Sequence, residues 1–158
     1  MTVFRIALRK FGPTAKAAFN GSSGYYTDGR WHSRGRYLDY AAESRSLATL
    51  ERLVHYKRFD SLEPHVIYTV EVPNAQIDRV LSPPRRWDGD DLLAAAQAIG
   101  NNWCDKAASP ALQVPSAVTI GENNLMLNSH HPAWDWKWVV SAAIPFDFDA
   151  RLAELLKR

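Results

Sequence analysis

Alternating apolar and polar residues predict a series of β-strands, and residues 66–72 give the clearest signal. Tyr68, Val70 and Val72 would share one face of this strand, and Pro73 would end it. Shorter or less regular alternation predicts further strands elsewhere in the chain, at residues 3–8, 37–42, 111–114 and 139–146.

A helical period after residue 44 places a carboxylate among apolar side chains. At about 3.6 residues per turn, Glu51 falls within one broad arc together with Leu47, Leu50, Val54 and His55. The opposite face is polar and carries Arg45, Thr49 and Arg52. Burying an unpaired carboxylate is costly, so Glu51 should either pair with Arg30 or Arg5 in the core or take part in chemistry. The pattern leaves both readings open.

The remaining helices are predicted from their caps. Ser44 is a candidate N-cap of the helix that carries Glu51. A second helix would begin at an acidic group, end at Gly100 and be followed by a helical turn at 102–107; the acidic residues are Asp88, Asp90 and Asp91. Asp149 would cap a last short helix at 151–157.

Two segments rich in turn-forming residues, 11–28 and 77–86, are expected to be connections. Trp134, Trp136 and Trp138 alternate at the period of a strand, which would place their rings on one face. That face is either a partner surface or part of the core.

Composition narrows the class of protein. The 158 residues are expected to form one domain, 1–158, and 19 basic against 17 acidic residues argue against a dedicated nucleic-acid binder. Cys104 is the single cysteine, which favours a reducing cytoplasm, and we see no secretion signal or apolar run long enough for a membrane span. The histidines show no HExxH spacing, so no metal site is expected.

Three sequence blocks stand in a fixed order: GRWH at 29–32 followed by Gly35-Arg36, YAA at 40–42, and LERLVH at 50–55. In order and spacing they resemble the RES domain, the toxin half of bacterial RES–Xre toxin–antitoxin pairs. Two later blocks extend the resemblance over roughly residues 4–146: VPSA at 114–117 and NLMLNSHHP at 124–132. The family is named for an arginine, a glutamate and a serine, and Ser116 in the VPSA block is taken as that serine. In the last block Ser129 stands where the family usually has proline, so Ser129 is a second candidate for the same role.

The resemblance implies an α+β fold: a single domain with an ADP-ribosyltransferase-like split β-sheet core flanked by helices. Such a domain would bind NAD in a central cleft. The implied reaction is cleavage of the bond between nicotinamide and ribose, which passes through an oxocarbenium-like state. Glu51 would face the positive charge on the ribose. Arg30 would hold the pyrophosphate with a planar fork of donors, assisted by Arg5.

Other site residues follow from the same resemblance. Tyr40 would stack against nicotinamide, and Ser116 would bond the ribose or orient Glu51. Asn124 is assigned to NAD binding. Trp31 either packs under the sheet or stacks on a base.

The function implied by the resemblance is a toxin that degrades NAD as a glycohydrolase or phosphorylase. One alternative is an ADP-ribosyltransferase that modifies a protein. An alternative of another class is a non-catalytic binding module or a nucleic-acid-acting toxin. An Xre-type helix-turn-helix antitoxin is expected to cover the active site, with the toxin as a homodimer inside a larger complex and with no direct nucleic-acid or membrane contact.

Overall fold

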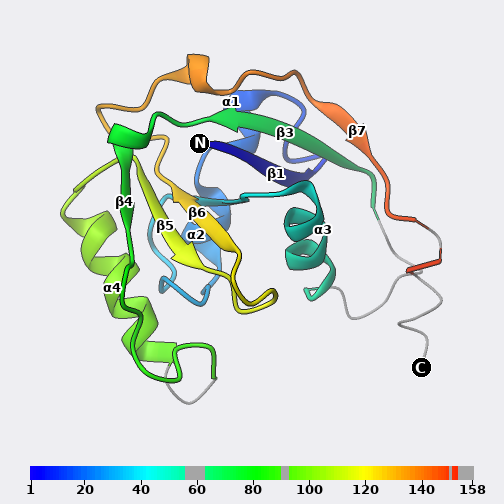
Figure 1. Cartoon of the computed structure of the whole chain (residues 1–158). Helices are drawn as coiled ribbons and strands as arrows, with labels where there is room; N and C mark the ends of the chain where they lie inside the picture. Colours follow the sequence, from blue (N-terminus) through cyan, green and yellow to red (C-terminus); the bar gives the residue numbers. More distant parts are fainter. Residues whose placement is uncertain (56–62, 90–92, 150, 153–158) are drawn as a thin grey trace.

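The computed structural model describes residues 1–55, 63–89, 93–149 and 151–152, which form a seven-stranded sheet with helices beside it (Figure 1). The strand order is β4-β5-β6-β2-β1-β3-β7. The strand bounds are β1 Thr2–Leu8, β2 Asp39–Ala42, β3 His65–Glu71, β4 Ile77–Arg79, β5 Ala111–Pro115, β6 Asn123–Leu127 and β7 Ile144–Phe146. Neighbouring strands are antiparallel except β4 and β5, which are parallel.

The sheet is split between β1 and β2. These strands share a single register pair, Phe4 opposite Ala42, whereas β1 and β3 pair along their full length. Arg5 spans the split, because its Nη1 donates to the Tyr40 carbonyl at 2.9 Å and its Nη2 contacts Asp39 at 2.6 Å. The predicted α+β fold with a split sheet is therefore confirmed, and Arg5 supplies bonds that the strand ladder lacks there.

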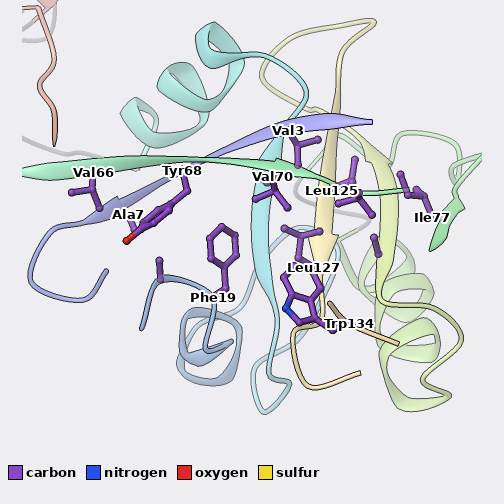
Figure 2. Packing of buried hydrophobic residues seen from close by; sticks show 14 residues of the cluster. Val3, Ala7, Phe19, Val66, Tyr68, Val70, Ile77, Leu125, Leu127 and Trp134 are labelled. Carbon is purple, nitrogen blue, oxygen red and sulfur yellow. The ribbon is translucent and has the colours of Figure 1, made fainter. Parts of the chain in front are cut away.

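One face of the sheet carries the main hydrophobic core (Figure 2). Alternate residues of β3 and β6 point to this face and include Tyr68, Val70, Leu125 and Leu127. Phe19 closes the core from below the sheet, with its ring edge-on to Tyr68 at a centroid distance of 5.6 Å. The strict alternation that predicted strand 66–72 is thus the alternation between the two faces.

The other face is covered by two helices. The first is α3, Arg45–Leu53, which packs Leu47 and Ala48 against β1, β2 and β3. The second is α4, Leu93–Asp105, which packs Ala96 and Trp103 against β5 and β6. Figure 1 shows α3 and α4 on either flank of the β5–β6 pair. No helix in these described ranges is both long and apolar enough to cross a membrane.

Several elements differ from the sequence prediction because they are very short. The segment predicted as a loop contains α1, Ala15–Ala18, and α2, Ser22–Tyr26. The segment predicted as a turn-rich connection contains β4, and the 3₁₀ turn η1, Asn74–Gln76, lies just before that segment. Elements of three to five residues are too short for a periodic pattern to develop.

Gly100 does not end a helix, as was predicted, but lies inside α4. A Cβ at this position would sit 1.9 Å from the carbonyl oxygen of Trp31, so the glycine allows the helix and the loop to touch. The predicted caps Asp90 and Asp91 lie outside the described residues.

The C-terminal part also differs from the prediction. Trp136–Trp138 is a 3₁₀ turn, η3, and not a strand; the Trp134 ring is buried and lies edge-on to both Trp136 and Trp138. The last strand, β7, is only Ile144–Phe146 because Val139 makes just an isolated bridge. Asp149 accepts from the backbone of Arg151, while the rest of the predicted helix lies outside the described residues.

Candidate active site

Ser44 caps helix α3, as predicted, and the helix carries Glu51 toward the β5–β6 connection. The Ser44 hydroxyl accepts from the backbone of Leu47 at 3.0 Å and donates to Glu122 at 2.9 Å, which ties the helix start to that connection. The buried arc of the helix differs from the predicted one, since Leu50 and Val54 are 41% and 58% exposed. Leu47, Ala48 and Leu53 are the buried residues instead, and Glu51 lies half-buried beside them.

The Glu51 carboxylate is held by two neutral donors. Its Oε1 accepts from Ser116 Oγ at 2.7 Å and from Asn124 Nδ2 at 2.5 Å. Among the described residues no hydrogen bond reaches Oε2, and no arginine pairs with the carboxylate. The ion-pair alternative named Arg30 or Arg5 as the partner of Glu51. Arg5 is not that partner, because it bonds Asp39 and Ala18 on the face of the sheet opposite α3.

Ser116 is a hydroxyl with every bonding position used. It is 3% exposed, and its oxygen accepts from the backbone amides of Val118 at 3.0 Å and Thr119 at 3.1 Å. Its proton is directed at Glu51. The rival serine, Ser129, donates instead to the backbone carbonyl of Phe19. Of the two serines, Ser116 is therefore the one in contact with Glu51.

Asn124 and Tyr40 reach the same face of the sheet from neighbouring strands. Asn124 on β6 pairs with Ala42 on β2, and Tyr40 lies two residues before Ala42 on the same face. The negative charge of Glu51 contributes to raising the pKa of Tyr40, although burial of the phenol is the larger cause. Tyr40 therefore stays protonated at neutral pH.

The Tyr40 hydroxyl lies 2.9 Å from His32 Nδ1, and His32 Nε2 lies 3.1 Å from the carbonyl of Thr27. A carbonyl only accepts, so Nε2 carries the proton and Nδ1 accepts from Tyr40. Burial lowers the pKa of His32, which favours this neutral form. Gly29 packs closely against both His32 and Tyr40.

Arg30 follows Gly29 and is half-buried. Its Nη1 donates to the backbone carbonyls of Trp87 at 3.2 Å and Gly89 at 3.3 Å. The carbonyl of Gly29 accepts from Gln97 on α4 at 2.9 Å, so the loop that carries Arg30 is fixed to that helix.

Trp31 and Arg5 support the site from within the protein. Trp31 is 2% exposed, its Nε1 donates to Pro115 at 3.2 Å, and its ring packs on Trp87. Stacking on a base is therefore wrong for Trp31, and the packing alternative describes it. Each nitrogen of the Arg5 guanidinium donates to a protein oxygen, which commits Arg5 to the split in the sheet rather than to a ligand.

Asp39 is a residue that the sequence reasoning missed. It is 1% exposed and accepts from Arg5, from the Gly21 amide at 2.7 Å and from the Ser23 hydroxyl at 2.8 Å. The sequence could have indicated Asp39, because it is an aspartate inside a predicted strand, and a buried carboxylate needs a cation as its partner. Within the described part of the chain, no group of His, Cys, Asp or Glu could hold a metal ion.

A family model described as the RES domain matches residues 2–149. A protein called Toxin Res from Yersinia enterocolitica is 32% identical over 155 residues, covering 96% of this chain and 99% of that protein. A protein called Prs ADP-ribosylating toxin from a Sphingobium species is 30% identical over 118 residues, covering 72% of this chain and 73% of that protein.

The fold has a relative among solved structures, the MbcT–MbcA toxin–antitoxin complex of M. tuberculosis. The TM-score is 0.68 at 14% sequence identity, covering 99% of this chain and 88% of that chain. At this identity the likeness speaks for the fold and not for the chemistry.

Proposed function

The chain belongs to the RES domain family, and we propose that it is the toxin of a toxin–antitoxin pair that consumes NAD by breaking the bond between nicotinamide and ribose. The observation that carries the proposal is the Glu51 carboxylate, whose Oε1 is held by Ser116 and Asn124 while Oε2 has no donor among the described residues. A carboxylate that is anchored at one oxygen is oriented without being neutralised.

The chemistry needs a negative charge beside the ribose. When the C1′–N bond breaks, its electron pair leaves with nicotinamide and positive charge develops on the ribose. Oε2 of Glu51 would stabilise that charge and accept a hydrogen bond from a ribose hydroxyl. No positive side chain bonds Glu51 among the described residues, so its charge remains available.

The other residues would bind and orient NAD. Arg30 would hold the pyrophosphate, since its guanidinium presents a planar fork that matches phosphate oxygens. Tyr40, which is partly buried beside Glu51, would stack against nicotinamide. Ser116 and Asn124 would orient Glu51, and this contact gives Asn124 a role through the carboxylate rather than through NAD alone.

The group that takes the ribose distinguishes the proposed activity from its alternative. With water the chain would be an NAD glycohydrolase, and with phosphate an NAD phosphorylase. With a protein side chain it would be an ADP-ribosyltransferase, which is favoured by one observation, the name of the Sphingobium relative. Cleavage of the nicotinamide–ribose bond beside Glu51 is common to all of these reactions.

We propose an Xre-type antitoxin as the partner, with the toxin as a homodimer inside the complex. The solved relative is itself a toxin–antitoxin complex. Leu50 and Val54 are exposed on the helix that carries Glu51, and Val118 and Ile120 are exposed in the connection that follows Ser116. Exposed apolar side chains on both elements that hold the Glu51 site support a surface that a protein covers.

Nicotinamide release tests the proposed reaction. The purified chain is incubated with NAD in water, in phosphate buffer and with a cell extract as a source of protein acceptors, and free nicotinamide is followed by chromatography. We expect release in at least one condition. We expect Glu51→Gln to lose it by at least about a hundredfold, because glutamine keeps the shape and removes the charge.

Glu43→Gln is the matched control, because Glu43 lies at the end of β2 and bonds Asn123 outside the proposed site. Its release should equal that of the unmodified chain. Equal release from Glu51→Gln and the unmodified chain would refute the assignment of Glu51. Absence of release from the folded chain in every condition would refute the NAD reaction and favour the binding-module alternative.

A further inference from the structure

Tyr40 is bonded through its hydroxyl to a histidine that the proposed chemistry does not use. His32 is 2% exposed, and its ring lies within hydrogen-bond distance of the Tyr40 hydroxyl. Its Nε2–H donates to the carbonyl of Thr27, and its Nδ1 accepts the Tyr40 hydroxyl at 2.9 Å. With neutral His32 protonated at Nε2, Thr27 to Tyr40 is therefore one directed chain of hydrogen bonds.

The glycine of the GRWH block fits this chain of bonds. A Cβ at Gly29 would lie 2.5 Å from His32 Cε1, 2.6 Å from His32 Nδ1 and 3.0 Å from the Tyr40 hydroxyl. Gly29 also pairs with His32 in an isolated bridge. Only glycine lets the backbone approach both rings so closely.

The backbone of Tyr40 is fixed separately. Its carbonyl accepts from Arg5 at 2.9 Å, and its strand pairs with Met126 on β6. The backbone contacts leave rotation about the side-chain bonds as the remaining freedom of the tyrosine. The hydrogen bond to His32 removes that freedom, because a partly buried phenol stays where its hydroxyl is satisfied.

We propose that His32 is a positioning residue for NAD binding, which acts by holding the Tyr40 ring in the orientation that receives nicotinamide. The inference rests on the proposed function and adds a residue to it. His32 would act through Tyr40 and would contact neither NAD nor Glu51. Its role depends on one atom, the accepting Nδ1.

Two substitutions of His32 separate its two hydrogen bonds. Asparagine places its side-chain oxygen near the position of Nδ1 and can accept from Tyr40, but it is too short to reach Thr27. Glutamine reaches toward the position of Nε2 and can donate to Thr27, but it has no acceptor at the position of Nδ1. The pair is matched, because each variant keeps one bond and loses the other.

The full chain and its variants are compared by the KM and kcat of nicotinamide release. We expect His32→Gln to raise KM for NAD about tenfold and to change kcat less than about threefold, because a lost hydrogen bond that orients a binding group affects binding before chemistry. His32→Asn should recover most of the lost KM. A purely structural role would lower the folded fraction and hence the apparent kcat, while KM stayed the same.

A double-mutant cycle checks that His32 acts through the Tyr40 hydroxyl. In the Tyr40→Phe background, His32→Gln and His32→Asn should have the same KM, because no hydroxyl remains to be held. An undiminished difference between them in that background would overturn the inference. So would an unchanged KM in His32→Gln. The unmodified chain is the separate test of the premise: no release from it would overturn the proposed function and this inference with it.

Discussion

Replacing Ser116 by alanine removes a hydroxyl that bonds three groups at once. It donates to Glu51 at 2.7 Å and accepts from the amides of Val118 and Thr119. A hydrogen bond to a charged group contributes about 1.5–3 kcal/mol. Val118 is exposed, so its freed amide can bond water and should add little. We therefore expect Ser116→Ala to lower the free energy of unfolding by about 1–3 kcal/mol, measured by thermal or urea unfolding.

The effect on catalysis should exceed the effect on binding. Without Ser116, Asn124 is the remaining described donor to Glu51, and the carboxylate can rotate about its last side-chain bond. Orientation of Glu51 matters most when charge develops on the ribose, so kcat should fall about 10- to 100-fold, equivalent to about 1.4–2.7 kcal/mol of barrier. KM should change little, because the lost interaction acts mainly in the transition state.

Ser129→Ala is the matched control for this prediction. It removes one hydroxyl from a neutral hydrogen bond to the Phe19 carbonyl and leaves Glu51 untouched. It should cost about 0.5–1.5 kcal/mol of stability and leave kcat unchanged. Both variants are assayed well below their unfolding temperatures. A normal kcat in Ser116→Ala, or a larger loss in Ser129→Ala, would refute the view that Ser116 orients the carboxylate.

Three further substitutions test separate parts of the structure. Asn124→Asp should lose more nicotinamide release than Asn124→Ala, because a second carboxylate beside Glu51 raises the pKa of one of them; equal loss would contradict this. Gly100→Ala should lower the unfolding temperature, because the alanine Cβ would collide with the main-chain oxygen of Trp31. In an ordinary helix interior the same change would stabilise the helix by about 1 kcal/mol. Arg30→Lys should weaken NAD binding in a titration about tenfold, since an ammonium cannot form the planar fork.

Much of the fold could be predicted because two paired strands, β1 and β3, are long enough for a strand pattern to develop. β1 and β3 each span seven residues, and the strand predictions at 3–8 and 66–72 agree with them within two residues. The helix predicted to end at Gly100 shows the limit of local rules. Glycine usually marks a helix end, but here the reason for glycine is a contact with Trp31 that only the tertiary structure creates.

The contacts of Glu51 could be predicted only in part. Glu51 could be singled out from the helix alone, because a carboxylate beside buried positions needs an explanation. Ser116 and Asn124 stand 65 and 73 residues away, and neither spacing nor composition indicates that they meet Glu51. The resemblance to the RES domain selected them. It did not say that both would bind the same carboxylate oxygen.

The two faces of the sheet explain why Glu51 binds neutral donors rather than Arg5. At the split, β1 and β2 share one register pair, and Arg5 is committed there to Asp39 and to the Tyr40 carbonyl. Arg5 and Asp39 lie on the face of the sheet that packs on Ala18 and Phe19. Glu51 lies on α3, which packs on the opposite face. Glu51 is held by hydrogen bonds that keep its negative charge in place, as a site for a developing cation requires. Arg5 therefore serves the proposed site indirectly: its own ion pair holds β2, and with it Tyr40, beside a carboxylate that it does not neutralise.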